Sequence, residues 1–204
     1  MMIKKAEMRL LHLSWIKVQD LSEKIAYMIL KSNYHPNIIV AVSRGGFNPA
    51  RILCDQLLVR ILASVQIEFY TNINNKKNIP SIICPLNADV NSSKVLIVDD
   101  VSDSGETLEL AFKHVKERGA LEVRVATLHI KPRTKYVPHY YAEEVDSWIV
   151  YPWEPIESMK NISKRLIENG FSKEDIQVKL IELGFNQKIV AKIYGSSNIY
   201  KSSS

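Results

Sequence analysis

Three aspartates lie within five consecutive residues in the segment KVLIVDDVSDSGETL, which spans residues 94–108. The part SDSGET suits an anion such as phosphate, because its hydroxyls and glycine backbone stand at the expected start of a helix, where N–H groups are open. Carboxylates repel phosphate, so Asp99 and Asp100 need another partner. They suit the hydroxyls of a sugar or a divalent ion, each charged hydrogen bond contributing about 1.5–3 kcal/mol. The segment therefore predicts a phosphorylated sugar as ligand.

The elements that must position these aspartates are strands alternating with helices. Val- and Ile-rich strands in such an alternation predict an α/β fold with a mostly parallel sheet flanked by helices. Ligands of such sheets bind beyond the carboxyl ends of the strands, where Asp99 and Asp100 lie. The predicted strands are residues 37–43, 64–71, 94–100, 122–130 and 146–152, and the predicted helices are about 15–32, 49–62 and 105–118.

The composition changes after Pro155, where no strand pattern remains and Gly170 and Gly184 provide helix stops. We therefore expect a core domain over residues 1–155 and a C-terminal three-helix appendage over residues 156–204. The expected role of the appendage is stability or a dimer contact. Its predicted helices are residues 157–169, 173–183 and 187–194.

A second glycine-containing loop follows the strand predicted at residues 37–43. In VAVSRGGFNPARIL, Ser43, Arg44, Gly45 and Gly46 stand between that strand and a helix. A glycine pair lets the backbone approach an anion closely, and Arg44 adds positive charge. The loop is thus a second candidate anion site.

The segment VLIVDDVSDSGETL resembles the phosphoribosyl pyrophosphate (PRPP) signature of type I phosphoribosyltransferases, and VAVSRGGFNPARIL is similar to the pyrophosphate-binding loop of their 6-oxopurine branch. The resemblance extends over roughly residues 8–155. It implies a purine-salvage enzyme that transfers ribose 5-phosphate from PRPP to a purine base, with Mg²⁺ as cofactor and a nucleotide and pyrophosphate as products. It also implies a homodimer.

The resemblance also implies a role for each candidate residue. Asp103 would take the proton near purine nitrogen seven, help that is typically worth about 10²- to 10⁴-fold in rate, and Arg44 would stabilise the departing pyrophosphate. Ser102 and Glu106 depart from the usual family pattern, in which an apolar and a non-acidic residue are common. The implied binding residues are Asp103, Ser104, Gly105, Glu106 and Thr107 for PRPP and its 5'-phosphate, Asp99 and Asp100 for the ribose hydroxyls, Ser43, Arg44 and Gly45 for pyrophosphate, and Asp100 and Glu154 for Mg²⁺.

The segment TLHIKPRTKYVPHYYAEEVDSWIVYPWEP resembles the base-binding part of the same branch. The resemblance implies that Lys131 approaches position six of the purine, Trp148 stacks on its face and the main chain near Ile149 contacts its edge. Lys131 donates hydrogen bonds, which favours a 6-oxopurine such as hypoxanthine, guanine or xanthine. The C-terminal helices instead resemble those of crenarchaeal adenine phosphoribosyltransferases. Because that match involves a whole architecture and one lysine can rotate, we expect adenine, giving AMP, with a 6-oxopurine as the alternative.

A further alternative is a regulator that senses PRPP and has lost catalysis. It would need the PRPP pocket alone, whereas Asp103, Arg44 and Trp148 are all present. A net charge of +5 and a pI near 9.1 suit a phosphorylated ligand, but the appendage lacks a concentrated Lys/Arg face, so we do not expect a nucleic-acid partner.

The chain has no apolar run of the roughly 18–20 residues that a membrane span needs, and its amino end does not resemble a signal peptide. We therefore expect a cytoplasmic protein with no membrane partner. The long polar stretch at about residues 71–93 is expected to be a flap that closes over the site.

Overall fold

The computed structural model describes residues 8–71 and 78–194, which form two compact units. The first, which we call the sheet unit, is Ile16–Asp146. The second, the helical unit, combines the residues up to Trp15 with those from Ser147 onward.

This division differs from the predicted one at residue 155 because two short strands pair within the helical unit. Strand β1 (Leu10–His12) lies parallel to β8 (Trp148–Val150). The strand predicted at 146–152 is therefore shorter than expected and lies outside the main sheet. As a division by function, the predicted boundary stays a prediction.

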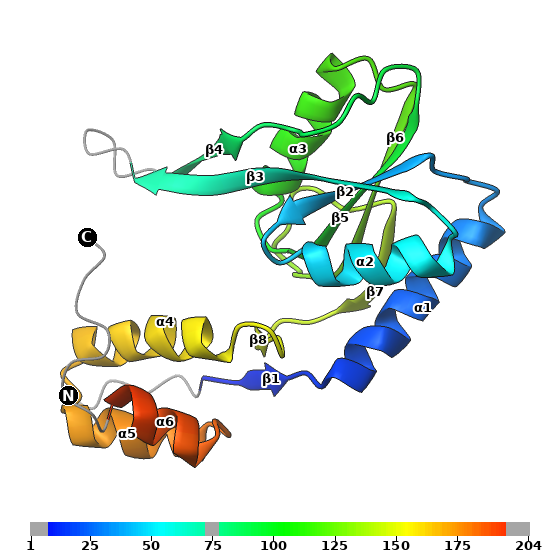
Figure 1. The fold of residues 1–204 in the computed structure, drawn as a ribbon. Helices are drawn as coiled ribbons and strands as arrows, with labels where there is room; N and C mark the ends of the chain where they lie inside the picture. Colours follow the sequence, from blue (N-terminus) through cyan, green and yellow to red (C-terminus); the bar gives the residue numbers. More distant parts are fainter. Residues whose placement is uncertain (1–7, 72–77, 195–204) are drawn as a thin grey trace. The chain divides into compact units, whose positions relative to one another are not determined.

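In the described part of the sheet unit, one six-stranded sheet has the order β4-β3-β2-β5-β6-β7 (Figure 1). All neighbouring strands are parallel except β4, which pairs antiparallel with β3 at the edge. The α/β prediction is confirmed. The strands are β2 (Ile38–Ser43), β3 (Ile61–Thr71), β4 (Asn78–Cys84), β5 (Lys94–Ser102), β6 (Glu122–Ile130) and β7 (Tyr140–Glu144).

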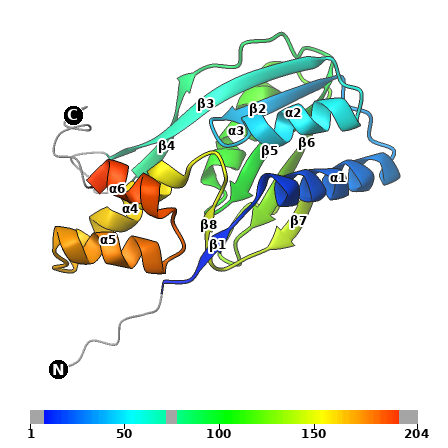
Figure 2. The same cartoon turned by 60° about the horizontal axis from the view of Figure 1, so that its bottom comes forward.

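Helices cover both faces of this sheet. Helices α1 (Trp15–Lys31) and α2 (Phe47–Gln56) lie on one face, and α3 (Glu106–Glu117) lies on the other (Figures 1 and 2). The chain passes from β2 through α2 to β3 on one side, and from β5 through α3 to β6 on the other. The winding therefore reverses between β2 and β5, and such a switch point is where ligands of open α/β sheets bind.

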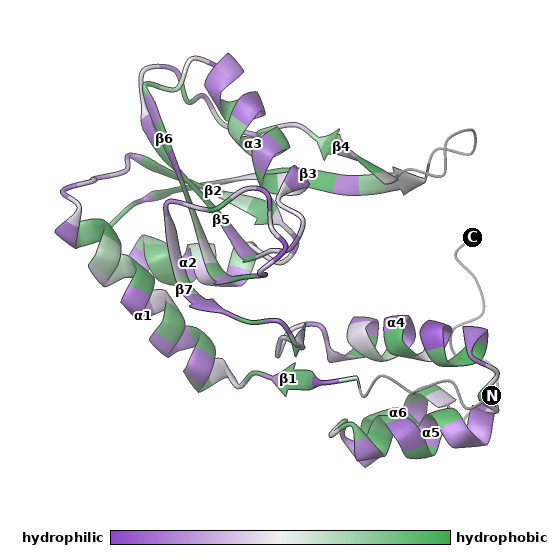
Figure 3. Cartoon of the chain, turned by 180° about the vertical axis from the view of Figure 1, so that it is seen from behind, coloured by the Kyte–Doolittle hydropathy of each residue, from purple (hydrophilic) through white to green (hydrophobic). Residues whose placement is uncertain are grey.

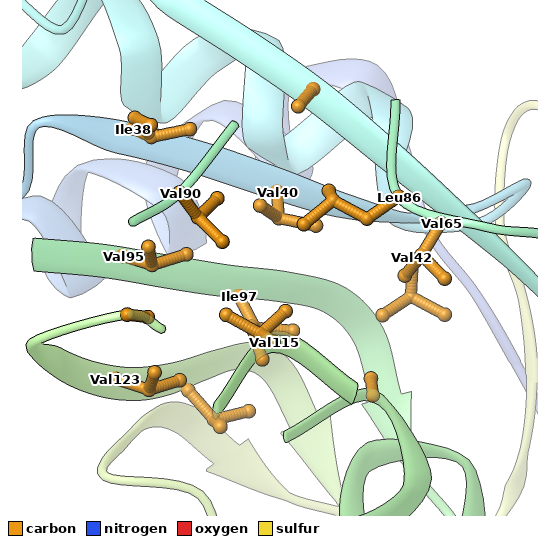
Figure 4. Close-up of a cluster of buried hydrophobic side chains, with 14 of the residues drawn as sticks. Ile38, Val40, Val42, Val65, Leu86, Val90, Val95, Ile97, Val115 and Val123 are labelled. Carbon is orange, nitrogen blue, oxygen red and sulfur yellow. The ribbon is translucent and has the colours of Figure 1, made fainter. Parts of the chain in front are cut away.

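The core under α3 is built from branched aliphatic side chains that alternate along the strands. Val40 and Val42 of β2 and Val95 and Ile97 of β5 point toward α3, where Val115 meets them (Figure 4). Each is at most 3% exposed, and full burial of such a side chain is worth about 1.5–3 kcal/mol. Helices α1, α3 and α4 show alternating hydrophobic and hydrophilic bands, as expected for helices with one buried face (Figure 3).

Helix α2 and strand β7 are among the elements that differ from the sequence prediction. The helix predicted at residues 49–62 ends at Gln56, because Leu58 adopts a left-handed conformation with φ of 54° and β3 begins at Ile61. Strand β7 was not predicted, because its sequence YYAEE follows β6 without an intervening helix. Parallel neighbours are usually joined through a helix.

The polar stretch predicted as a flap, at about residues 71–93, follows β3 and contains β4, which pairs with β3. Strand β3 continues to Thr71, and β4 occupies Asn78–Cys84. Residues 72–77, near the start of the predicted flap, lie outside the described residues, so the flap stays a prediction.

Three helices of the helical unit confirm the predicted helical segments after residue 155. They surround a core of their own that includes Met159, Ile162 and Leu180. A capping box between Ser172 and Asp175 begins the second of these helices. The helices are α4 (Pro155–Glu168), α5 (Lys173–Glu182) and α6 (Gln187–Tyr194). In the described part of the chain, none of the helices is long and apolar enough to cross a membrane.

Candidate active site

Two loops meet at the switch point of the sheet. One follows β2 and contains Ser43–Gly46, and the other follows β5 and leads into α3. A Cβ atom added to Gly45 would lie 2.6 Å from Cγ of Asp100. The two motifs, more than 50 residues apart in the sequence, are therefore in direct contact.

The loop after β2 is held against the strand ends by its backbone. The Gly46 N–H donates to the Val42 carbonyl over 2.9 Å, and the Ser43 hydroxyl donates to the Val65 carbonyl over 3.2 Å. The Ser43–Arg44 peptide bond is cis. A Cβ on Gly46 would collide with the carbonyl oxygens of Val98 and Val42, so only glycine fits there.

Asp99 and Asp100 are nearly buried at the end of β5, with 9% and 8% of their surfaces exposed. The Asp100 N–H donates to Oδ1 of Asp99 over 2.9 Å. Buried carboxylates are costly unless they have partners. Two of them at a switch point, beside an open glycine backbone, suit hydroxyl or cation ligands.

The loop after β5 turns through Gly105, which has φ of 89°. Helix α3 begins at the next residue, so the free N–H groups of its first turn and the Ser104 hydroxyl adjoin this turn. The Glu106 N–H lies 3.4 Å from that hydroxyl. A helix start of this kind favours a phosphate, although Glu106 and Glu109 place negative charge in the same turn.

We call the loop after β5, residues 102–105, the phosphate loop after its predicted ligand. Residues 131–136 pack along this loop, and the sequence analysis did not predict that contact. The Lys131 N–H donates to the Ser102 carbonyl over 2.9 Å, and the Lys135 N–H donates to the Ser104 carbonyl over 3.0 Å. The Ser102 and Thr134 hydroxyls lie 2.7 Å apart, and the Ser102 hydroxyl also donates to the Tyr136 carbonyl over 2.9 Å. The unusual serine at 102 was the available signal, because a buried hydroxyl needs a polar partner.

Lys131 lies at the end of β6 and is only 7% exposed. Burial lowers the pKa of its amine below the usual value, and Arg133 acts in the same direction, while Asp103 and Asp146 oppose the shift. Asp103 itself is half exposed and forms an ion pair with Arg133. Lys131, Asp103 and Arg133 thus form one electrostatic group beside the phosphate loop.

The remaining predicted residues belong to the helical unit. The guanidinium carbon of Arg165 lies 4.6 Å from the centre of the Trp148 ring. Ile149 is buried, and Glu154 immediately precedes α4. The roles of these residues in base and metal binding stay predictions.

The buried His129, two residues before Lys131, should make the stability of the fold depend on pH. Burial lowers the pKa of His129 to about 4; Glu143 opposes the shift, and Lys131 and Lys17 reinforce it. The unfolded chain, with a histidine pKa near 6.5, binds more protons between these values, so acidification from about pH 6.5 to 4 should lower the free energy of unfolding by up to about 3 kcal/mol. Urea titrations at several pH values measure this. The variant His129→Gln should show a flatter dependence, and an equal slope would contradict the prediction.

Comparison with known proteins identifies the family of this chain. The family model described as phosphoribosyl transferase domain matches residues 14–157. The chain belongs to the phosphoribosyltransferase family, and the relatives identify its purine branch.

Three relatives illustrate the match. The xanthine-guanine phosphoribosyltransferase of Cereibacter sphaeroides is 30% identical over 150 residues, covering 70% of this chain and 86% of that protein. A purine phosphoribosyltransferase from Pyrococcus horikoshii Ot3 is 36% identical with a TM-score of 0.65, covering 72% and 94% of the two chains. A Neisseria gonorrhoeae protein with bound ppGpp is 25% identical with a TM-score of 0.63, covering 80% and 98%.

These relatives contradict the expectation of adenine as the base, because curated relatives from several organisms are named xanthine-guanine phosphoribosyltransferases. The expectation rested on the C-terminal helices. These helices enclose a separate core, and the family match ends at residue 157, so nearly all of them lie outside it. The resemblance of the helices to those of an adenine enzyme is not shown, and the names of the relatives fit the 6-oxopurine alternative better.

Proposed function

We propose that the protein is a 6-oxopurine phosphoribosyltransferase. It transfers the 5-phosphoribosyl group of PRPP to xanthine, guanine or hypoxanthine and releases pyrophosphate. The observation that carries the proposal is the buried Lys131, whose backbone is hydrogen-bonded to Ser102 beside the phosphate loop. The names of the relatives support the same class of base.

The base preference follows from hydrogen-bond chemistry. A lysine amine is a donor with no acceptor when charged. It pairs with the carbonyl oxygen at position six of an oxopurine, whereas the amino group of adenine at that position is itself a donor. The proposed roles of Trp148 and of the main chain at Ile149 in base binding rest on the family resemblance.

The two loops divide the anionic groups of PRPP between them. The turn at Ser104–Thr107 and the start of α3 bind the 5'-phosphate, and the Ser43–Gly45 backbone with Arg44 binds pyrophosphate. Asp99 and Asp100 accept hydrogen bonds from the two ribose hydroxyls. The contact between Gly45 and Asp100 supports this division, because the pyrophosphate and the ribose hydroxyls lie on the same side of the sugar.

Mg²⁺ suits the oxygen ligands that carboxylates and the phosphates of PRPP would offer. Among the described residues, no cluster of three or more His, Cys, Asp or Glu side chains is placed to hold a metal ion. Mg²⁺ is commonly held by one or two carboxylates together with substrate phosphates and water, and Asp100 with Glu154 would provide these carboxylates. When bound, the ion would neutralise charge on the pyrophosphate.

The chain's own residues then assist a substitution at ribose C1'. Nitrogen nine of the base forms the new bond as the bond to pyrophosphate breaks, and the electron pair leaves with pyrophosphate. Arg44 stabilises that leaving group. Asp103 accepts the proton that the base loses at nitrogen seven, so the nucleotide leaves neutral at the ring.

Separate steady-state assays with xanthine, guanine, hypoxanthine and adenine, each with PRPP and Mg²⁺, test the proposal. A pocket built to hydrogen-bond its substrate can reject the wrong pattern by about 10⁴- to 10⁵-fold. We expect nucleotide formation from at least one oxopurine and far less from adenine. Turnover of no base would favour the regulator that senses PRPP without catalysis.

A homodimer and a cytoplasmic location are further parts of the proposal. Sedimentation tests the first, and cell fractionation tests the second.

Two adjacent glycines should respond differently to alanine. Gly46→Ala is expected to lower the free energy of unfolding by about 1–3 kcal/mol, because its Cβ meets rigid backbone oxygens of Val98 and Val42. Gly45→Ala should cost less stability, because its Cβ meets the Asp100 side chain, which can rotate away. That rotation should lower kcat/KM for PRPP by at least about 10-fold, the loss expected for one charged hydrogen bond. Urea titration and PRPP saturation curves compare the two variants, and equal stability losses would contradict the distinction.

A further inference from the structure

Arg133 lies between two hydrogen bonds that join the phosphate loop to the segment 131–136. On one side the Lys131 N–H reaches the Ser102 carbonyl, and on the other the Lys135 N–H reaches the Ser104 carbonyl. Asp103 is the residue between the two acceptors, and Arg133 is midway between the two donors. The backbone therefore brings these two side chains face to face.

The contact between them has a directional geometry. Nε and Nη2 of Arg133 lie 2.7 Å and 2.5 Å from the same oxygen, Oδ1 of Asp103. Two donors in one rigid plane restrict the rotation of a carboxylate more than a single amine does. Both Arg133 contacts are to Oδ1, so Arg133 does not occupy the second carboxylate oxygen, Oδ2.

The segment around Arg133 is well anchored. The Ser102 hydroxyl is buried and bonds both Thr134 and Tyr136. A Cβ on Gly105 would lie 2.6 Å from the Tyr136 backbone nitrogen, so the two segments are in van der Waals contact. Arg133 therefore extends from a segment that is anchored directly against the phosphate loop.

We propose that Arg133 is a positioning residue that holds the Asp103 carboxylate in its working orientation, with Oδ2 toward the base. The inference rests on the proposed function, in which Asp103 accepts the proton from the purine. Arg133 need not touch either substrate. Its side chain is 66% exposed, and an exposed ion pair contributes little to folding, so its removal should alter catalysis without altering stability.

The test compares kcat and KM for PRPP and for the preferred oxopurine among matched variants. Arg133→Gln is expected to lower kcat about 10-fold, a modest part of the loss that misplacing a reacting group causes, with both KM values nearly unchanged. Arg133→Lys keeps the charge without the two-donor plane and should recover only part of the loss. Lys135→Gln removes the same charge two residues away and should leave kcat unchanged. Thermal unfolding of each variant should match that of the unmodified protein.

The decisive comparison uses Asp103→Asn as background. If Arg133 acts through Asp103, Arg133→Gln should have no further effect on kcat in that background. An equal loss in both backgrounds, or an equal loss from Lys135→Gln, would overturn the inference while leaving the proposed function intact. Absence of nucleotide formation by the unmodified protein would overturn the proposed function and this inference together.

Discussion

Replacing Asp103 with asparagine is expected to lower kcat for the oxopurine substrate by about 10²- to 10⁴-fold, the usual contribution of a positioned general base. Asparagine has nearly the same shape but cannot accept a proton. The KM for PRPP should change much less, because the phosphate loop binds largely through its backbone. Asp103 is half exposed, and its side chain pairs with the exposed Arg133, so the variant should fold normally.

Steady-state kinetics over a range of pH values measures this effect. The matched control is Glu109→Gln, which makes the same change of acid to amide in the first turn of α3 and should leave kcat within a few-fold of the unmodified protein. If Asp103→Asn raised the KM for PRPP and left kcat intact, Asp103 would be a binding residue and its proposed role as a base would be wrong.

Replacing Lys131 with methionine is expected to lower kcat/KM for the oxopurines by about 10- to 100-fold. Methionine fills a similar volume without a donor, and one hydrogen bond from a charged group is worth about 1.5–3 kcal/mol. The loss should be larger for the oxopurines than for adenine, which does not use this donor. The matched control is Lys135→Met, since the side chain of Lys135 is exposed.

The pH dependence gives a second readout for Lys131. Because burial lowers its pKa from the usual 10.5, its charge is lost at a lower pH than for an exposed lysine. The kcat/KM for hypoxanthine should therefore begin to fall below pH 10.5, and the part of the decline that belongs to Lys131 should disappear in Lys131→Met. An unchanged selectivity between hypoxanthine and adenine in that variant would show that Lys131 does not contact the base.

Local patterns predicted much of the fold. Val18, Leu21, Ile25 and Ile29, spaced three or four residues apart, are all buried along α1, because this periodicity depends on nothing beyond the helix itself. The end of α2 was predicted six residues too late, since Leu58 adopts a backbone conformation that its side chain does not favour. Strand β7 was missed because its partner β6 supplies the hydrogen bonds that define it.

The expectation of adenine as the base illustrates a related error. The C-terminal helices were easy to find in the sequence, and they were given more weight than one lysine. These helices form a hydrophobic core of their own, and a core of this kind does not indicate which base is bound. Bases are distinguished by individual hydrogen-bond donors and acceptors, and the relatives are named for 6-oxopurines, the class of base that the chemistry of a lysine donor also favours.

The sequence alone was enough to locate both candidate anion-binding loops, because a glycine turn, a hydroxyl and the start of a helix act over a few neighbouring residues. It also determined the class of the fold and the family resemblance. Only the tertiary structure revealed that Gly45 lies against Asp100 and that Arg133 holds Asp103. These pairs join residues 55 and 30 positions apart, and what brings each pair together is the order of strands at the switch point and the parallel pairing of β5 with β6. Neither property is written in any short stretch of the chain, because strand order and pairing arise from packing of the whole sheet.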